Sequence, residues 1–254
     1  MKQIATSILA SSLLAALTMA QPPRYTITDL GVSSTYINTN SGLISGTVTA
    51  TDGTSHAALW QKGQWKDIAV PGLHGKNSIA FSVNDSGQAE TSTPDPNGED
   101  FCGFKAFEFP TLGASCVPFL WQNDVMTPLL TLGGRNGFAA AINNQGVAAG
   151  AAENTIKDPD CGAPQQFQIK PVSWQNGKVQ ELPIPAGDTN GMVFGMNDIG
   201  QMVGASGPCR DLDPISGTYV RQKHAVLWQN GQFTDLGSLE EGQERARLEI
   251  SRFR

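Results

Sequence analysis

The sequence has few charged residues and few aromatic ones. Asp, Glu, Lys and Arg make up 16% of the 254 residues, Phe, Trp and Tyr make up 7%, and only three residues are His. The net charge is −6, and no cluster of Lys and Arg is long enough to neutralise a row of phosphates. The composition therefore argues against nucleic acid as a partner.

Long apolar runs are absent beyond the first 20 residues. Lys2 precedes an apolar stretch from Ile4 to Met19, and small residues flank Met19 ahead of Gln21. This pattern is typical of a cleaved secretory signal peptide, and the stretch is short for a membrane span. An uncleaved signal anchor is the alternative. We expect residues 1–20 to be removed and the mature chain to be secreted or periplasmic, without a membrane span.

Sustained helical periodicity is also missing from the mature chain. Gly (28) and Pro (15) are abundant, and the apolar runs are short and regularly spaced. Such a balance is typical of a turn-rich all-β protein, because strands rather than helices accommodate short apolar runs between turns. The remaining length suffices for one domain with its own core.

Four of the five tryptophans stand in one recurring motif, in which Trp-Gln precedes a short turn such as Asn-Gly. They are Trp60, Trp121, Trp174 and Trp228, at spacings of 61, 53 and 54 residues. Asn-Gly favours a tight hairpin because both residues tolerate positive φ. We expect 225–228 and 232–236 to pair in this way, with a less ideal turn at Asn123-Asp124. Bulky apolar residues that recur with a repeat normally form the core between units, although stacking on a cofactor is an alternative.

A second motif, Asn-x-x-Gly, follows the first at a nearly constant distance. Its copies are Asn84 to Gly87, Asn143 to Gly146 and Asn197 to Gly200. The polar residues form a turn in which Gly takes the left-handed position, so 192–196 and 201–205 are expected to pair as strands.

Two hairpins per repeat predict units of four antiparallel strands, as in the blades of a propeller. The fold class is therefore predicted as all-β, a propeller-like array of about four such units over residues 21–239. Tyr25–Gly31 matches the second strand of a unit, and a sheet completed by strands from both termini would close a ring. Residues 240–254 break the pattern with a charged tail; a solvated tail and a truncated or frame-shifted array are both open interpretations.

The paired motifs resemble the HAF-repeat family of bacterial extracellular repeat proteins. The resemblance rests on His56 to Trp60, His224 to Trp228 with Thr234 to Gly237, and Ile142 to Val147, and it covers roughly Tyr25 to Leu239. The middle copies depart from it, since they lack the His-Ala start. The resemblance implies export and a propeller-like fold, and it implies no catalytic residues.

The connections sort onto two faces, and the long ones share one face. They span roughly 89–116, 151–170 and 206–223, and they contain all four cysteines. Without a Cys-x-x-Cys pair, zinc binding and thiol redox chemistry are weak interpretations, whereas disulfides suit an exported chain. Three pairings are possible; we predict Cys102–Cys116 as a local bond and Cys161–Cys209 as a bond between adjacent units. Long loops on a rigid scaffold often bind ligands, although neutral insertion explains them equally well.

Candidate chemistry in these loops is sparse. Asp95, Asn97 and Asp100 offer oxygen ligands for calcium, but the spacing does not match an EF-hand loop and the residues also suit an ordinary turn. His56 and His224 occupy the same repeat position, which favours a structural role. We identify no catalytic residue and no cofactor. The sequence favours a non-enzymatic binding or surface scaffold protein with a glycan or protein ligand; a secreted polysaccharide-acting enzyme and a truncated fragment are the alternatives.

Overall fold

The computed structural model describes residues 25–31, 33–38, 41–69, 77–95, 115–161, 165–209 and 224–237. The chain divides into two units, Met1–Leu30 and Gly31–Arg254. The described part of the first unit, from Tyr25, contains no strand, and the side chains of Tyr25 and Ile27 are exposed. The prediction of a strand over Tyr25–Gly31 is therefore wrong. A single strand is not stable without a strand to pair with. Each described sheet already consists of four strands, and none of these strands includes residues 25–31.

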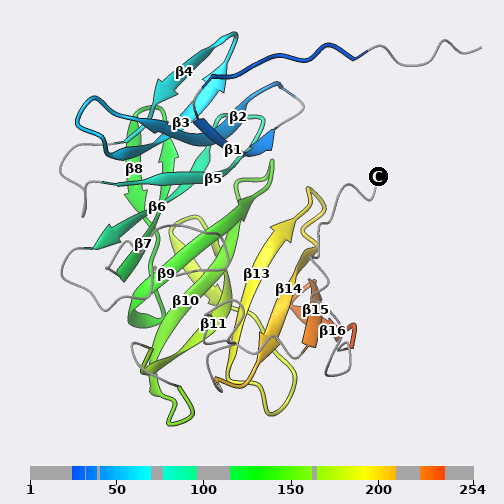
Figure 1. Cartoon of the computed structure of the whole chain (residues 1–254). Coiled ribbons are helices and arrows are strands. Elements are labelled where there is room, and N and C mark those ends of the chain that lie inside the picture. The colour runs from blue at the N-terminus through cyan, green and yellow to red at the C-terminus, as the bar shows by residue number, and fades with distance from the viewer. Residues whose placement is uncertain are drawn as a thin grey trace, which may run out of the picture. The chain divides into compact units, whose positions relative to one another are not determined.

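The second unit contains four antiparallel sheets of four strands each (Figure 1). The first sheet comprises β1 (Ser33–Asn38), β2 (Ile44–Thr49), β3 (Ser55–Gln61) and β4 (Gln64–Asp67), and the second comprises β5 (Ile79–Val83), β6 (Ala89–Asp95), β7 (Ser115–Gln122) and β8 (Val125–Pro128). The third comprises β9 (Gly133–Ile142), β10 (Ala148–Lys157), β11 (Phe167–Gln175) and β12 (Lys178–Glu181), and the fourth comprises β13 (Asn190–Met196), β14 (Met202–Gly207), β15 (His224–Gln229) and β16 (Gln232–Asp235). The predicted all-β, propeller-like array of four units is confirmed.

The Trp-containing hairpins close with two residues of positive φ. Asn176 and Gly177 have φ of 51° and 73°, and Asn230 and Gly231 have 53° and 74°. Two left-handed residues in succession match the right-handed twist of the flanking strands. In the second sheet Asp124 adopts φ 64° without being Gly, so the turn predicted to be less ideal keeps the same geometry.

The order of the two hairpins within a sheet differs from the prediction, in which the Trp hairpin comes first. Each sheet begins with the strand before the Asn-x-x-Gly turn and ends with the strand after the Trp hairpin, and its four strands are consecutive in the chain. The two hairpins of a sheet join through the β2–β3 pairing and its equivalents, such as Ala205 opposite Ala225. None of the described sheets combines strands from both ends of the chain. The sequence left open whether such a sheet closes a ring, and each described sheet consists of four strands that are consecutive in the chain.

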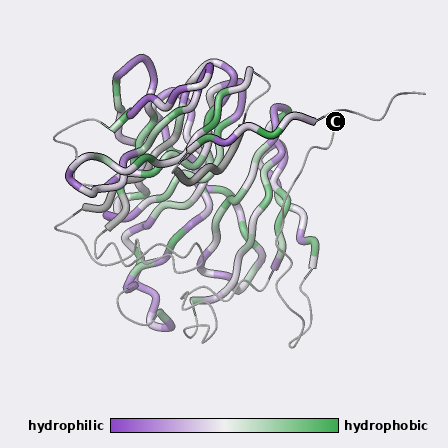
Figure 2. The backbone as a smooth tube through the Cα atoms, turned by 45° about the horizontal axis from the view of Figure 1, so that its top comes forward, coloured by the Kyte–Doolittle hydropathy of each residue, from purple (hydrophilic) through white to green (hydrophobic). Residues whose placement is uncertain are grey.

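The innermost strands share a β-bulge, which the sequence analysis did not predict. The register shifts past Phe81 in β5, past Ala140 in β9 and past Phe194 in β13. All three bulge residues belong to one apolar cluster, in which Phe81 and Phe138 contact edge to face with ring centroids 4.7 Å apart. A β-bulge places one extra side chain outside the regular alternation of the strand. In β5, β9 and β13 this side chain joins the same apolar cluster, so the first strands of three sheets share one core. The apolar stretches run along the strands, and the hairpin turns are more hydrophilic (Figure 2).

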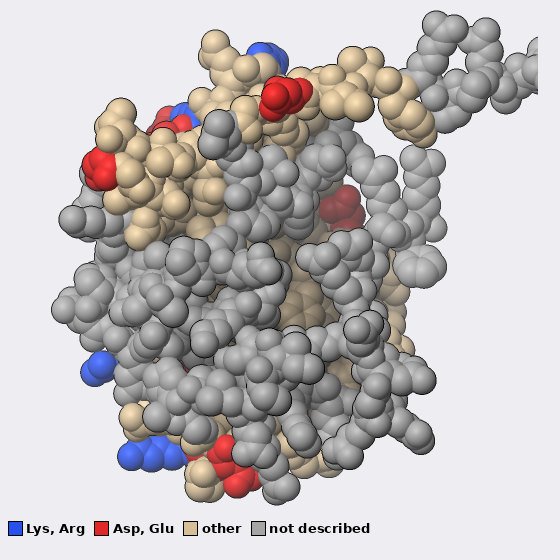
Figure 3. Space-filling view, in the orientation of Figure 1, with Lys and Arg blue, Asp and Glu red and all other residues tan. Residues whose placement is uncertain are grey.

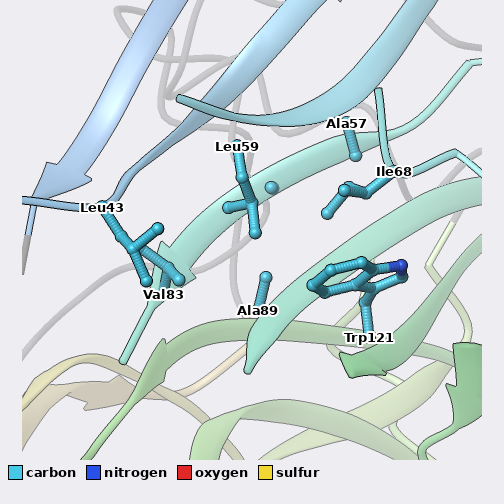
Figure 4. Close-up of a cluster of buried hydrophobic side chains, with 8 residues drawn as sticks. Leu43, Ala57, Leu59, Ile68, Val83, Ala89 and Trp121 are labelled. Atoms are coloured by element: carbon cyan, nitrogen blue, oxygen red, sulfur yellow. The ribbon is translucent and has the colours of Figure 1, made fainter. Parts of the chain in front are cut away.

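Neighbouring sheets pack through the repeated tryptophans. Figure 4 shows Trp121 of the second sheet with Leu59 and Ile68 of the first. Trp228 of the fourth sheet packs on Leu182, which follows the last strand of the third. A buried tryptophan contributes a large apolar area, so these contacts form much of the boundary between sheets.

Candidate functional site

Turns and connections lie at opposite edges of the sheets, because strands alternate in direction. The hairpin turns after β1, β3 and their equivalents form one edge, which we call the turn face. The connections from β6 to β7, β10 to β11 and β14 to β15, with those from sheet to sheet, form the other, the long-loop face. On the side of the molecule seen in Figure 3, the described Lys and Arg side chains are not gathered in one patch.

Several predicted site residues lie outside the described parts of the long-loop face. Asn97, Asp100 and Cys102 belong to such a segment, and only the backbone of Asp95 (end of β6) and Cys116 (β7) is described. The calcium site and the Cys102–Cys116 bond therefore stay predictions.

The predicted bond between Cys161 and Cys209 is present. Cys161 follows β10 of the third sheet and Cys209 follows β14 of the fourth, with Cα atoms 4.8 Å apart at a sequence separation of 48. The bond joins connections of two adjacent sheets at the long-loop face. It thereby ties the β10–β11 connection to the start of the β14–β15 connection. The first of these is shorter than the predicted 151–170, because β10 runs to Lys157 and β11 begins at Phe167.

A buried hydrogen-bond network lies between the same two sheets. Asn190 is fully buried, and its Oδ1 accepts hydrogen bonds from Gln165 Nε2 and from the Ile169 amide, both at 2.8 Å. Its Nδ2 donates to Thr189 Oγ1 at 2.9 Å and to Asp158 Oδ2 at 3.4 Å. Asn190 therefore connects the start of β13 to both ends of the β10–β11 connection. The buried Oε1 of Gln165 has no hydrogen-bond partner among the described residues, so the network fixes these segments without satisfying every polar atom in it.

Asp188 collects two donors from the fourth sheet. Ser206 Oγ donates to Asp188 Oδ2 at 2.5 Å, and His224 Nδ1 lies 2.8 Å from the same oxygen. In a catalytic triad the imidazole lies between the hydroxyl and the carboxylate, whereas here both contact one carboxylate oxygen. His56 of the first sheet makes a similar contact, 2.7 Å from Asp67 Oδ2. The geometry agrees with a structural role for both histidines.

One group of possible metal ligands comprises Asp158, Cys161 and Cys209, whose donor atoms lie within 4.8 Å of one another. Both sulfur atoms are bonded to each other, so neither is available as a thiolate. One carboxylate remains, and it already accepts hydrogen bonds from Asn190 and from the Asp160 amide. The group has too few donors to hold a metal ion.

Lys170 is a largely buried cation at this end of β11. Burial lowers the pKa of its ammonium, and the carboxylates of Glu181, Asp158 and Asp188 act in the opposite direction. Desolvation disfavours the charged form, while opposite charges favour it. The ammonium of Lys170 thus lies near three carboxylates beneath the long-loop face and compensates part of their negative charge.

The turn face carries an interaction that the sequence analysis missed. The residues after the motif asparagines are Asp85, Asn144 and Asp198, and they link the turns of neighbouring sheets. The amide of Asp85 donates to Asn144 Oδ1 and the amide of Asn144 donates to Asp198 Oδ1, both at 2.8 Å. Asn144 Nδ2 also donates to Oδ2 of each aspartate at 2.9 Å. The alternation of Asp and Asn at this repeat position was the available signal.

The motif asparagines hold their own turns. Asn84 Oδ1 accepts from the amides of Ser86 and Gln88, and its Nδ2 donates to the carbonyl of Asn143 in the next sheet at 2.9 Å. Asn143 repeats this arrangement toward the carbonyl of Asn197, at 3.4 Å. The glycine of each motif takes positive φ, such as 75° at Gly87. The second motif therefore stabilises both a turn and a sheet boundary.

Comparisons with known proteins reveal a likeness to solved structures. No family model matches the chain, and no curated protein matches it. Among solved structures, the chain is similar to the β-propeller domain of the Trilobed protease from Pyrococcus furiosus, which has an open velcro topology. The identity is 10% and the TM-score 0.46, over 83% of this chain and 56% of that chain. The match thus spans little more than half of that chain.

The described segments contain no helix with the length and apolar character needed to cross a membrane.

Proposed function

We propose that the protein is an exported, non-enzymatic binding or scaffold protein, and that a glycan or protein ligand binds on its long-loop face. This proposal is supported by the covalent and hydrogen-bond contacts beneath that face. A disulfide and a buried network centred on Asn190 hold the bases of two connections on that face, one from each of two sheets. Loops whose bases are held in advance lose less conformational entropy when they bind. Among the described residues, the one Ser, His and Asp cluster lacks the geometry of a nucleophile activated by a base.

Three features support export. The first 20 residues have the pattern of a signal peptide, a disulfide is characteristic of oxidising compartments, and the paired motifs resemble the HAF-repeat family. We propose membership of that family together with secretion or periplasmic location.

The test begins with the chain from residue 21, purified with disulfides intact and screened against arrays of glycans and surface proteins. The affinity for a bound ligand is then measured with the double variant Cys161→Ser and Cys209→Ser, which removes the covalent link between the two connections. We expect this variant to bind at least tenfold more weakly. Ile199→Ala on the turn face is the matched control, because its side chain is 74% exposed, and it is expected to bind as the wild type does.

Two outcomes would contradict the proposal. The first is a ligand whose affinity depends on Ile199 and not on the disulfide, since this would place binding on the turn face. The second is release of reducing ends from a polysaccharide by the wild type, since this would make the protein an enzyme.

A further inference from the structure

Three metal-ligating side chains meet at one corner of the boundary between the third and fourth sheets. Asp158 and Cys161 follow β10, and Cys209 follows β14. One carboxylate oxygen of Asp158 and the two sulfur atoms lie within 4.8 Å of one another. Asp158 is 6% exposed and Cys209 is 1% exposed, so both side chains lie away from bulk solvent. Only thiolate sulfur binds a metal ion strongly, so the disulfide keeps this corner from acting as a metal site.

Hydrogen bonds hold these residues in place independently of the disulfide. The amide of Cys161 donates to the Asp158 carbonyl at 3.0 Å, and the amide of Cys209 donates to Thr189 Oγ1 at 3.2 Å. Thr189 Oγ1 also accepts from Asn190 Nδ2, which donates in turn to the Asp158 carboxylate. Reduction of the disulfide therefore leaves both cysteines beside Asp158.

The carboxylate of Asp158 can coordinate a metal ion and keep its support. Its Oδ1 accepts from the Asp160 amide at 3.0 Å, whereas the hydrogen bond from Asn190 Nδ2 to Oδ2 is long, at 3.4 Å. A carboxylate that binds a metal ion is normally oriented by a hydrogen bond of this kind. Oδ2 is thus the oxygen available for coordination.

The charges around this corner favour a cation. The carboxylates of Asp158, Asp188 and Glu181 lie near the ammonium of Lys170. His224 contacts Asp188, and even a positive charge on its imidazole leaves the sum over these five residues negative. A divalent cation would therefore reduce the repulsion among the carboxylates.

We propose that Asp158, Cys161 and Cys209 bind a zinc ion once a dithiol has reduced the disulfide, and that this ion then links the third and fourth sheets. The dithiol transfers two electrons and two protons to the disulfide and is itself oxidised to a disulfide. Zinc then displaces the two thiol protons and binds both thiolates and one oxygen of Asp158, with water as the fourth ligand.

The geometry and the donor set both suit zinc. The two sulfur atoms of a tetrahedral zinc site lie about 3.8 Å apart, because each Zn–S bond is about 2.3 Å long. Side-chain rotation brings two cysteines to this separation from Cα atoms that are 4.8 Å apart. Two thiolates select zinc over calcium or magnesium, which prefer oxygen ligands. The zinc site is independent of any ligand on the long-loop face, and it retains the link between the two connections in reducing surroundings.

The first measurement is a cobalt titration of the reduced chain from residue 21, with Cys102→Ser and Cys116→Ser so that one cysteine pair remains. Cobalt is the probe because a tetrahedral cobalt–thiolate site absorbs visible light strongly. We expect one equivalent to bind, zinc to displace it, and the disulfide-bonded form to show no such absorption. Asp158→Asn is expected to weaken zinc binding at least tenfold. Asp124→Asn on the turn face removes the same charge from an exposed residue and is expected to bind zinc as the parent does.

The second measurement uses the chain with all four cysteines and locates the bound zinc by mass spectrometry. Iodoacetamide alkylates free thiols, and zinc is expected to slow the alkylation of Cys161 and Cys209 at least tenfold in the reduced wild type. In Asp158→Asn the same concentration of zinc is expected to protect them less. Formation of the Cys161–Cys209 bond on reoxidation shows that a variant is folded at this corner.

Three results would overturn the proposal. The first is a reduced protein that binds zinc no more tightly than the disulfide-bonded protein does. The second is an Asp158→Asn variant that binds zinc as the parent does, since the carboxylate would then not be a ligand. The third is alkylation of Cys161 and Cys209 in the wild type at the same rate with and without zinc.

Discussion

Trp228 and Trp60 occupy the same repeat position, and the structure predicts different costs for their removal. Trp228 is 1% exposed, packs against Leu182 and Val193, and donates its indole N–H to the Pro183 carbonyl. Removing a buried Trp side chain leaves a cavity and costs about 3–5 kcal/mol. Trp60 is partly exposed and no described sheet precedes it, so Trp60→Ala is expected to cost about 1–3 kcal/mol.

The measurement is urea unfolding of both alanine variants with disulfides intact, at protein concentrations low enough to exclude association. We expect Trp228→Ala to lower the free energy of unfolding by at least about 1 kcal/mol more than Trp60→Ala does. Trp228→Phe keeps most of the apolar volume and loses the hydrogen bond, so its cost is expected to be nearer about 1–2 kcal/mol. Equal costs for the two alanine variants would refute the reasoning, since burial by the preceding sheet would then not determine the contribution of this position.

Three further predictions concern the disulfide, the turn face and one aspartate. Replacing Cys161 and Cys209 by Ser opens a loop of 48 residues and is expected to lower the free energy of unfolding by about 2–4 kcal/mol, measured by urea unfolding beside the wild type with and without reductant. Asn144→Asp places a third carboxylate between two others and is expected to lower the free energy of unfolding by about 1–2 kcal/mol at pH 7. Asn144→Ala should lower it by less. The difference between the two variants in urea unfolding should vanish at acidic pH, where the carboxyl groups are protonated. The hydroxyl of Thr54, and after it the amide of Thr54, hold the pKa of Asp52 below its ordinary value of 3.8. Thr54→Val is therefore expected to raise that pKa in an NMR titration. Because the pKa is lowered in the folded state, the associated stability is present at neutral pH and is lost as the pH falls through the folded-state pKa. An unchanged Asp52 titration in that variant would show that the side-chain hydrogen bond is not the cause.

The repeat motifs were sufficient to predict the fold class and the hairpins. Asn-Gly at 230–231 and Asn-x-x-Gly at 197–200 restrict φ over two to four residues, so the strands on either side are determined locally. The pairing of Cys161 with Cys209 was also predictable, because both cysteines fall in equivalent connections of adjacent units. These inferences need only local backbone preferences and the period of the repeat.

Only the tertiary structure decided how the hairpins group into sheets and what the repeated side chains contact. A Trp hairpin could pair with the Asn-x-x-Gly hairpin before it or with the one after it, and every turn would be the same in both cases. The pairing of β14 with β15 shows that it pairs with the one before it. The Asp85, Asn144 and Asp198 hydrogen bonds and the contact of Ser206 with Asp188 join residues 18 to 59 positions apart. The same Trp is buried in three sheets and partly exposed in the first for a similar reason: a sequence repeat specifies each unit, whereas burial depends on whether another sheet lies beside it.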